Sequence, residues 1–228
     1  YRYLRNHNPA PFSSFMNFGD FHILSSSPER FIQVKKDLIE TRPIKGTRKR
    51  GSTPIEDLSL KEELLHSEKD KSELLMIVDL ERNDLNHICQ PGSVAVPELF
   101  EIETYATVFH LVSTVRGKLY SNTGIAPLLH STFPGGSITG APKIRAMEII
   151  DELEESRRGI YTGSIGYFSR NGDSDLNIII RTLLHYKNTY YLGVGGGITY
   201  ESDSIFEYEE TMQKAKALLQ AAGQRHEA

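Results

Sequence analysis

The chain has 228 residues, with 26 Lys and Arg against 30 Asp and Glu and a formal net charge of −4. Hydrophobic residues make up 39% and charged residues 25%, a globular balance that excludes collagen, a coiled coil and a disordered tail. No apolar run reaches the roughly 20 residues of a membrane-spanning helix. Mild acidity argues against nucleic acid as the main partner, so we expect neither a membrane nor a nucleic acid.

Cysteine content and the first residues indicate the setting of the chain. Cys89 is the single cysteine and cannot form an internal disulfide, and no basic-then-apolar leader precedes the first motifs, so a cytoplasmic location is expected. The sequence begins at Tyr1 rather than at Met. We therefore expect it to be N-terminally truncated, a piece of a longer polypeptide.

Strand and helix patterns mix along the first part of the chain. The basic segment RPIKGTRKRG, bounded by Pro and Gly, is interpreted as a loop that grips a small anion. The segment 107–119 fits a helix or a strand. The remaining predictions are strands at 21–24, 30–34 and 38–42, a helical stretch at 58–88, a short strand at 93–96 and a helix at 125–133.

The last third is richer in strands. Pro142 is placed to open a helix with Ile144, Met147, Ile150 and Leu153 on one face. Strands are predicted at 163–168, 175–184 and 189–194, with a turn at Asn171-Gly172, and a helix at 205–221 ends at Gly223. Because strands and helices do not alternate regularly, the pattern favours an α+β fold.

Familiar cofactor signatures nearly appear but fail. Lys143 comes too late after Gly135-Gly136 for a P-loop, Gly193 to Gly197 lack the third glycine of a dinucleotide fingerprint, and no Cys pair supports zinc. A different set of segments is informative because of its order: Ser27-Pro28-Glu29, Pro43-Ile44-Lys45-Gly46-Thr47, Glu73 before Ile77-Val78-Asp79-Leu80-Glu81-Arg82-Asn83-Asp84, His110-Leu111-Val112-Ser113, Gly135-Gly136-Ser137-Ile138-Thr139-Gly140-Ala141-Pro142-Lys143, Gly195-Gly196-Gly197-Ile198, and Glu207-Tyr208-Glu209-Glu210-Thr211 with Lys214.

Together these segments closely resemble the chorismate-utilising enzymes, over about residues 20 to 220. The resemblance implies an α+β fold of two packed, mostly antiparallel sheets with helices on the outside. It also implies that residues 1–228 form a single chorismate-binding domain that lacks its N-terminal portion, and that chorismate is the substrate.

The resemblance implies Mg²⁺ as the cofactor, with Glu73 and Glu210 as its carboxylate ligands. Asp70 and Glu207 each lie three residues earlier, on the same helix face, and would stand behind those ligands. Acids on helices are usually solvated, however, and Glu210 with Lys214 also reads as an ordinary ion pair across one helical turn.

Matching positions suggest how the substrate is held. The resemblance implies ring and carboxylate contacts from Gly46, Thr47, Tyr161, Arg181, Gly195, Gly196, Gly197 and Lys214. An Arg fork donates two parallel hydrogen bonds to a carboxylate, and consecutive glycines let backbone N–H groups approach an anion. Without the resemblance, Arg181 is simply a polar residue on an apolar strand.

Three residues match catalytic positions. Glu29 matches the acid that protonates the departing C4 hydroxyl, although by itself it reads as a surface glutamate at a strand end. His110 matches a histidine near the reacting carbons, and a core histidine with satisfied hydrogen bonds is the alternative. Lys45 would attack C2 as a neutral amine, a form that burial and the neighbouring cations favour. Its alternative is a lysine that binds a substrate carboxylate.

Lys45 also separates members of the family. Aminodeoxychorismate synthases resemble PIKGT at this position and anthranilate synthases resemble PIAGT, and the chain reads PIKGT. The expected reaction is amination of chorismate at C4, which feeds p-aminobenzoate and folate synthesis. Cys89 lacks the setting of a glutaminase nucleophile, so a glutamine amidotransferase subunit or domain is the expected ammonia source. The alternatives are anthranilate synthase component I and a non-catalytic fragment that binds chorismate or the glutaminase.

Overall fold

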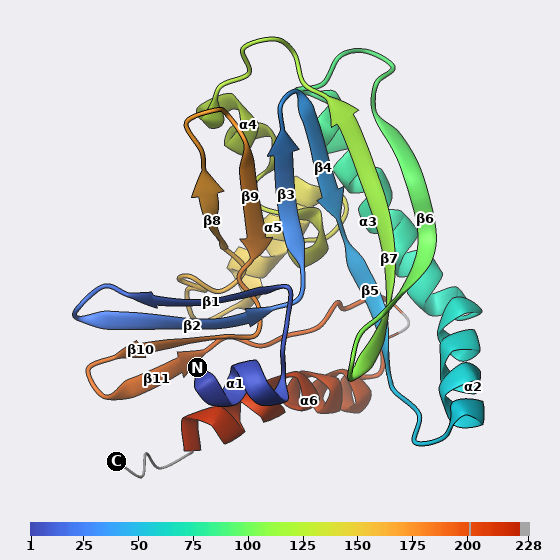
Figure 1. Ribbon diagram of the computed structural model, residues 1–228, viewed down its shortest axis with the longest axis vertical. Helices are drawn as coiled ribbons and strands as arrows, with labels where there is room; N and C mark the ends of the chain where they lie inside the picture. Colours follow the sequence, from blue (N-terminus) through green and yellow to red (C-terminus); the bar gives the residue numbers. More distant parts are fainter. Residues whose placement is uncertain (201, 224–228) are drawn as a thin grey trace. The chain divides into compact units, whose positions relative to one another are not determined.

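The computed structural model describes residues 1–200 and 202–223 and has an α+β fold, as the sequence predicts (Figure 1). Its strands form one four-stranded and one seven-stranded sheet. The pairs β1–β2, β2–β10, β10–β11, β3–β4, β4–β7, β5–β7 and β6–β7 are all antiparallel. The helices are α1 (Arg2–His7), α2 (Pro54–Leu65), α3 (Glu68–Asn86), α4 (Ile125–Thr132), the 3₁₀ turn η1 (Gly136–Ile138), α5 (Lys143–Leu153) and α6 (Ser204–Gly223). The strands are β1 (Phe12–Asn17), β2 (Phe21–Ser27), β3 (Arg30–Lys35), β4 (Leu38–Arg42), β5 (Ile44–Lys49), β6 (Ala95–Thr104), β7 (Val108–Lys118), β8 (Ser164–Phe168), β9 (Ser174–Ile178), β10 (Thr182–Tyr186) and β11 (Thr189–Leu192).

The chain divides into two compact units that are interleaved in sequence. Unit 1 contains residues 1–29, 156–165 and 177–228, and unit 2 contains residues 30–155 and 166–176. Two of the four boundaries, at 165/166 and 176/177, therefore fall within β8 and β9. The assignment of the whole chain to a single domain stays a prediction.

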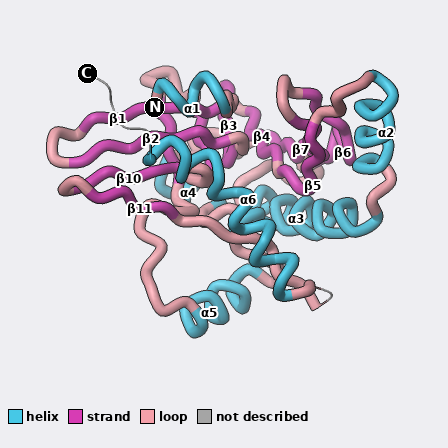
Figure 2. The backbone as a smooth tube through the Cα atoms, turned by 90° about the horizontal axis from the view of Figure 1, so that it is seen from below, coloured by secondary structure: helices cyan, strands magenta, loops and turns pink. Residues whose placement is uncertain are grey.

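Unit 2 is built on the larger sheet. The strand order is β5-β7-β4-β3-β9-β8. Strands β5 and β4 pair with successive parts of β7, and β6 also pairs with β7. Helix α3 packs on β7 and β5, and Figure 2 shows it running along these strands. The buried face of α3 carries Leu74, Ile77, Val78 and Leu85, which are at most 2% exposed. This apolar face, recurring at helical spacing, holds the helix against the sheet.

Unit 1 is built on the smaller sheet, in the order β1-β2-β10-β11 (Figures 1 and 2). Helices α1 and α6 contact each other. Leu4 of α1, Leu183 of β10 and Leu218 of α6 form one buried cluster. The first and last helices are thus joined through a common apolar core.

Several predicted elements are confirmed and others are corrected. The β3–β4 hairpin, α4, α6 and the turn at Asn171-Gly172 are present. The segment 107–119 is strand β7 and the short strand at 93–96 is part of the longer β6, whereas α1 and β1 were not predicted. The helical stretch at 58–88 is two helices, because the hydroxyl of Ser67 accepts the backbone N–H of Asp70 at 3.3 Å and starts α3 afresh.

The predicted basic loop is wrong, since its centre is strand β5. Two of its arginines, Arg48 and Arg50, pair with carboxylates of α2 and α3 rather than projecting into an open loop. Arg48 Nε lies 2.7 Å from Glu63 Oε1, and Arg50 Nε lies 2.7 Å from Asp57 Oδ1. The positive charge of this segment is therefore largely matched by acids of its own unit.

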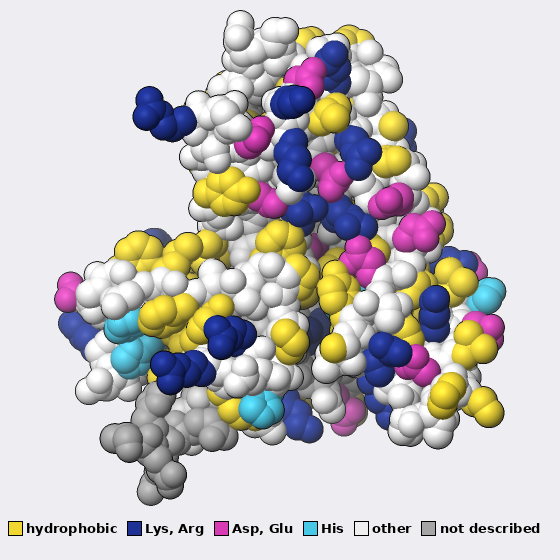
Figure 3. Space-filling model, in the orientation of Figure 1, with side chains coloured by type: hydrophobic (Ala, Val, Ile, Leu, Met, Phe, Trp, Pro, Cys, Tyr) yellow, Lys and Arg dark blue, Asp and Glu magenta, His cyan; other side chains and the backbone are white. Residues whose placement is uncertain are grey.

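Charges of both signs cover one face of the larger sheet, as Figure 3 shows over β3, β4 and β7. Arg30 donates to Asp175 on β9 at 3.0 Å and to Glu40 on β4 at 3.2 Å. Arg116 on β7 donates to the same glutamate at 2.6 Å. These pairs cross the sheet from strand to strand and explain how it presents a solvated face.

Helix α5 is the exception to the burial pattern. None of its residues is buried, and Ile144 and Leu153 are 76% and 71% exposed. Figure 2 shows it standing apart from α3. Its apolar stripe, which the spacing predicts, therefore has no core to cover in the described part of the chain.

None of the helices in the described ranges 1–200 and 202–223 combines the length and the apolar composition that a membrane-spanning segment needs.

Candidate active site

The segment PIKGT lies on strand β5, where a β-bulge interrupts its pairing with β7. Lys45 pairs with Leu111 and Thr47 pairs with His110, so Gly46 is the extra residue between them. Its φ is +74°, in the left-handed region that glycine adopts at bulges. A bulge bends the strand and changes the direction of neighbouring side chains, which is why bulges occur next to active sites.

Gly46 is also required by its surroundings. A Cβ at this position would lie 2.7 Å from Asp70 Cγ on α3 and 2.8 Å from Leu64 Cδ1 on α2. The bulge thus lets β5 pass directly against two helices. Every other residue type would be strained and would collide there.

Lys45 contacts a second segment that the sequence analysis had selected. Its side chain is half-buried, and Nζ donates a hydrogen bond to the backbone oxygen of Ser137 at 3.2 Å. Ser137 lies in η1, at the centre of GGSITGAPK. The fold therefore brings these two segments together, although 92 positions separate the bonded residues.

His110 has a polar partner on the neighbouring strand. Thr47 Oγ1 and His110 Nδ1 are 2.9 Å apart, and the ring of Tyr105 meets the imidazole edge-on at 5.4 Å. Tyr105 donates to Glu103 at 2.6 Å. Burial, followed by this hydrogen bond to Glu103, raises the pKa of Tyr105 to about 12, so its hydroxyl stays protonated beside the histidine.

The first turns of α3 supply the predicted acids of unit 2. Asp70 Oδ2 accepts from Arg48 of β5 at 3.2 Å, so it is paired within the protein. Glu73 is half-buried one turn further along the helix. We call Lys45, Gly46, Thr47, Asp70, Glu73 and His110 the strand cluster.

Arg181 occupies a break that the sequence did not predict. The expected strand at 175–184 is two strands, β9 and β10, which belong to different sheets. Arg181 lies between them with φ +51°, and its carbonyl accepts the backbone N–H of Ser26 at 3.0 Å. Burial lowers the pKa of Arg181, while the charges of Glu210 and Tyr161 raise it. Arg181 is thus a half-buried cation near a carboxylate, and it lies between two strands rather than within one.

Tyr161 and the glycine-rich segment after β11 lie against each other. A Cβ on Gly193 would overlap the Tyr161 ring, and one on Gly195 would lie 3.0 Å from the Tyr161 hydroxyl. Lys214 on α6 donates to the Gly195 carbonyl at 3.3 Å and lies 2.7 Å from Glu210 Oε1. The expected ion pair across one turn of α6 is therefore present.

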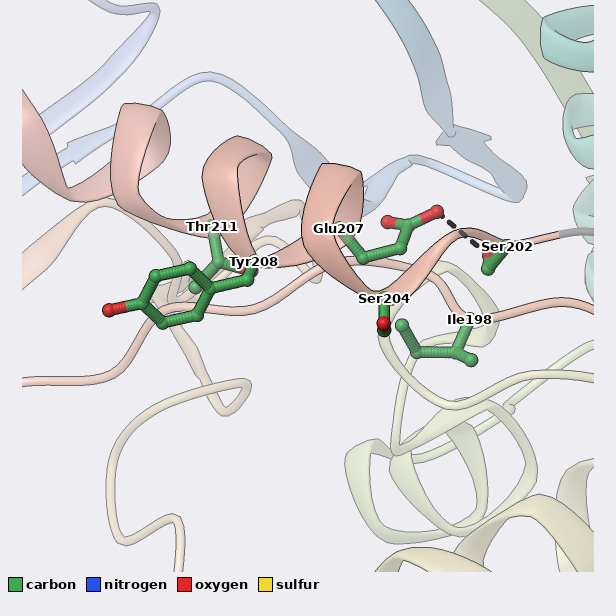
Figure 4. A pocket seen from close by; sticks show the side chains of 6 residues that line it. All are labelled: Ile198, Ser202, Ser204, Glu207, Tyr208 and Thr211. Atoms are coloured by element: carbon green, nitrogen blue, oxygen red, sulfur yellow. Dashed lines mark hydrogen bonds between the residues drawn. The ribbon is translucent and has the colours of Figure 1, made fainter.

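Glu207 lies one turn before Glu210 on the same face of α6, and its side chain is buried. It accepts a hydrogen bond from the Ser202 hydroxyl at 2.7 Å, as Figure 4 shows. A Cβ on Gly196 would lie 3.3 Å from Glu207 Oε2 and 3.6 Å from Lys214 Nζ. Beside this carboxylate is an open hollow of about 320 Å³, lined by Ile198, Ser202, Ser204, Glu207, Tyr208 and Thr211.

Glu29 follows β2 and is 6% exposed, so the reading of a surface glutamate is wrong. Its carbonyl accepts the N–H of Ile178 at 3.0 Å, and Ser27 Oγ donates to the Ile178 carbonyl at 2.6 Å. We call the unit 1 residues the loop cluster: Glu29, Tyr161, Arg181, Gly195, Gly196, Gly197, Glu207, Glu210 and Lys214.

The strand cluster belongs to unit 2 and the loop cluster to unit 1. Within the described residues, no group of three or more His, Cys, Asp or Glu side chains is arranged to hold a metal. The predicted ligands are nevertheless carboxylates on helices, and carboxylate oxygens are the hard donors that magnesium takes. The residues present therefore fit this cation in chemistry.

Two buried polar pairs were missed by sequence reasoning. Lys143 Nζ lies 2.5 Å from Asp84 Oδ2, and Thr41 Oγ1 donates to Glu81 Oε2 at 3.1 Å. The segments DLERND and GAPK contain three of these residues, and their charge in otherwise apolar surroundings was the available signal. Partners so far apart in sequence could not be matched without the fold.

Comparison with known proteins places the chain in a family. Residues 1–220 match the family model described as chorismate binding enzyme. The chain belongs to this family. The resemblance read from the ordered motifs, and the expectation of an enzyme fold of this type, are thereby confirmed.

Relatives of the chorismate binding family carry two different names. The chain is 51% identical to aminodeoxychorismate synthase component 1 of Klebsiella aerogenes, over 96% of this chain and 49% of that protein. It is 49% identical to anthranilate synthase component 1 1 of Haloarcula marismortui, over 96% of this chain and 45% of that protein. The crystal structure of anthranilate synthase component I from Streptococcus pneumoniae TIGR4 matches with a TM-score of 0.86 at 42% identity, over 95% of this chain and 48% of that one. The chain thus spans about half the length of these relatives.

Proposed function

We propose that the full-length protein aminates chorismate at C4 to give 4-amino-4-deoxychorismate. The observation that carries this proposal is the place of Lys45: a half-buried amine beside the Gly46 bulge, with its Nζ held 3.2 Å from the Ser137 carbonyl. A fixed amine on a strand is suited to nucleophilic attack, because its geometry is set before the substrate arrives. The similarity to aminodeoxychorismate synthases supports the same reaction.

The proposed reaction has two substitutions. The Lys45 amine forms a bond to C2, the ring double bonds shift, and the C4–O bond breaks as Glu29 gives a proton to the departing water. Ammonia then forms a bond to C4, the double bonds shift back, and the C2–N bond to Lys45 breaks. Atoms balance, since chorismate and ammonia give the amine product and water. Glu29 is 6% exposed, so this proton transfer would take place away from bulk water.

The remaining residues would bind and orient the substrate. Arg181 and Lys214 supply cations for the carboxylates, and the segment Gly195 to Gly197 supplies backbone N–H groups. Tyr161 would shape the same site, because its hydroxyl already lies near Gly195. Gly46 and Thr47 would lie along the ring beside Lys45, and Thr47 would orient His110 through the contact of 2.9 Å.

Magnesium is the proposed cofactor, held by Glu73 and Glu210 with Asp70 and Glu207 behind them. When bound, it would neutralise the charge of a substrate carboxylate. The side chains of this protein would do the rest: Arg48 orients Asp70 at 3.2 Å and Ser202 orients Glu207 at 2.7 Å. Removal of either ligand carboxylate should therefore weaken substrate binding more than it weakens the fold.

Ammonia is proposed to come from a separate glutamine amidotransferase subunit or domain, and the product would feed p-aminobenzoate and folate synthesis. Cys89 is unsuited to glutamine hydrolysis, because it is buried and burial raises the pKa of its thiol to about 11. A thiolate is the reactive form, and this environment opposes it.

The test is mass spectrometry of the full-length protein incubated with chorismate, Mg²⁺ and ammonium. Wild type should form 4-amino-4-deoxychorismate, and Lys45→Ala and Lys45→Gln should not. Lys49→Gln is the matched control, because Lys49 is an exposed lysine on the same strand. Without ammonium, intact mass should show an adduct on wild type equal to chorismate less water, and none on Lys45→Ala. Full rescue of the variants by ammonium would reduce Lys45 to a positioning residue.

The second candidate is anthranilate formation, favoured by the anthranilate synthase relatives at similar identity. It would add ammonia at C2 and release pyruvate, so the product distinguishes the two reactions in the same assay. Anthranilate as the product would refute the interpretation of Lys45 and leave the family intact. Tight chorismate binding without any product would support the non-catalytic alternative.

A further inference from the structure

The loop that contacts Lys45 is closed by a lysine at its end. Lys143 Nζ donates to the carbonyl of Pro134 at 2.8 Å and to that of Thr132 at 3.2 Å. The same ammonium lies 2.5 Å from Asp84 Oδ2 on α3. Residues 134–143 are thus joined end to end, and the junction is fixed to a helix by an ion pair.

This junction is shielded from water. The side chains of Lys143 and Asp84 are 15% and 11% exposed. A charge-assisted contact in such a place is stronger than one at the surface, and loss of one partner leaves the other buried and unpaired. Burial raises the pKa of Asp84 and outweighs the hydrogen bond from Lys143, which lowers it. The Asp84 carboxylate therefore depends on Lys143 to stay charged.

A second contact ties the same loop to α3. A Cβ on Gly136 would lie 3.0 Å from Leu80 Cδ2 and 3.4 Å from Glu81 Cγ. The backbone at Gly136 therefore lies directly on the helix. Ser137 follows it, and its carbonyl oxygen receives the hydrogen bond from Lys45. The position of the Ser137 carbonyl relative to α3 is therefore set by two contacts: the close packing of Gly136 before it and the ion pair of Lys143 after it.

We propose that Lys143 and Asp84 are positioning residues for Lys45, and that they act by fixing the loop whose Ser137 carbonyl holds the Lys45 amine. Neither residue contacts the substrate in this scheme. The inference rests on the proposed function in giving Lys45 the attacking role. A displacement of about 1 Å at an attacking group can cost on the order of 100-fold in rate, so a distant pair can control the step.

The first measurement is steady-state kinetics of the full-length protein with ammonium and chorismate. Lys143→Met should lower kcat at least about tenfold with KM little changed, because the proposed substrate-binding groups are elsewhere. Asp84→Asn should do the same, and the double variant should be no worse than either single one, since the pair acts as a unit. Lys143→Arg should recover part of kcat. Lys118→Met is the control, because Lys118 forms an exposed ion pair with Asp37 at 3.3 Å in the same unit.

The second measurement reports on Lys45 without catalysis. The rate of acetylation of Lys45 by acetic anhydride, followed by peptide mass spectrometry without substrate, should rise at least about threefold in Lys143→Met because its hydrogen bond to Ser137 loosens. Lys118→Met should leave this rate unchanged. If Lys143→Met fails to fold, Asp84→Asn replaces it, since this change keeps the shape of the side chain and removes only its charge.

The outcomes separate the two proposals. An unchanged acetylation rate and unchanged kcat in Lys143→Met and Asp84→Asn would overturn the positioning role, even if Lys45→Ala is inactive. A faster acetylation rate, with Lys45→Ala still active, would support the positioning role and refute Lys45 as the nucleophile. A drop in melting temperature with unchanged acetylation of Lys45 would assign the pair to stability alone and overturn the inference.

Discussion

The strand cluster and the loop cluster place their functional groups in different ways. In the strand cluster, Lys45 and Thr47 project from a paired strand, and Gly46 is held by contact with two helices. In the loop cluster, Arg181 lies between strands and Gly195 lies in the irregular segment after β11. The first arrangement fixes positions through the backbone, and the second through contacts among side chains. Lys45, which is expected to attack the substrate, thus lies on a paired strand, whereas most of the residues expected to bind the substrate lie in irregular segments or on α6.

The largest effect should come from replacing one glycine in each cluster by alanine. Gly46→Ala combines a left-handed backbone with a Cβ that would collide with Asp70 and Leu64, so we expect a loss of about 3 kcal/mol in the free energy of unfolding and little activity. Gly195→Ala meets only the end of the Tyr161 side chain and should cost less than about 1 kcal/mol while raising KM. Chemical denaturation and kinetics measure both. Equal stability losses would contradict the contrast between the clusters.

The next effect concerns Arg181, the half-buried cation of the loop cluster. Arg181→Gln should lower kcat/KM for chorismate about 30-fold, equivalent to roughly 2 kcal/mol, because a charged fork for a carboxylate is lost. The melting temperature should change less than in Gly46→Ala, since Arg181 lies outside the sheets. Arg181→Lys serves as the control for charge without the fork. A fall in kcat with unchanged KM would place Arg181 in the chemical step instead.

A smaller effect is expected for the hydrogen bond between Thr47 and His110. Thr47→Val keeps the shape but removes the hydroxyl that lies 2.9 Å from Nδ1, so we expect a cost of about 1 kcal/mol in kcat/KM. Thr47→Ser should retain the bond and most of the activity. Equal kcat/KM in the Val and Ser variants would mean that the orientation of His110 does not depend on Thr47.

The smallest effect is predicted for a residue in neither cluster. Burial raises the pKa of the Cys89 thiol to about 11, so the folded protein favours the protonated thiol. Its contribution to stability is full below the ordinary thiol pKa and falls as pH rises towards 11. Iodoacetamide at pH 8 should alkylate Cys89 only after unfolding, and Cys89→Ala should leave ammonia-dependent activity unchanged. Fast alkylation of the native protein would contradict its burial.

Local patterns predicted the parts of the fold that depend on neighbours in sequence. The β3–β4 hairpin and α6 follow from a turn signal and from apolar spacing. Strand β5 was missed because Pro43 and Gly46 suggest a loop, and its partner β7 is far away in the chain. The break at Arg181 was missed because apolar residues flank it on both sides, and only the separation into two sheets requires it.

The candidate residues were found through ordered motifs rather than through geometry. The sequence could suggest Lys45 as a special residue, but not its hydrogen bond to the Ser137 carbonyl. Asp84 and Lys143 lay inside quoted motifs without a role, because an ion pair between distant positions is visible only after folding. Burial of Glu29 likewise arises from the fold and not from its immediate neighbours.

The interleaving of the two units has a consequence for synthesis on the ribosome. Leu4 on α1 joins Leu218 on α6 in one buried cluster, so α1 is translated long before the helix that covers it. At about 5–20 residues per second, the delay between these two leucines is roughly 10 to 40 seconds. Unit 2 is nearly continuous in sequence, so its strands and helices can pair during this time. Leu4 must therefore stay without its partner Leu218 while the segment between them is being made.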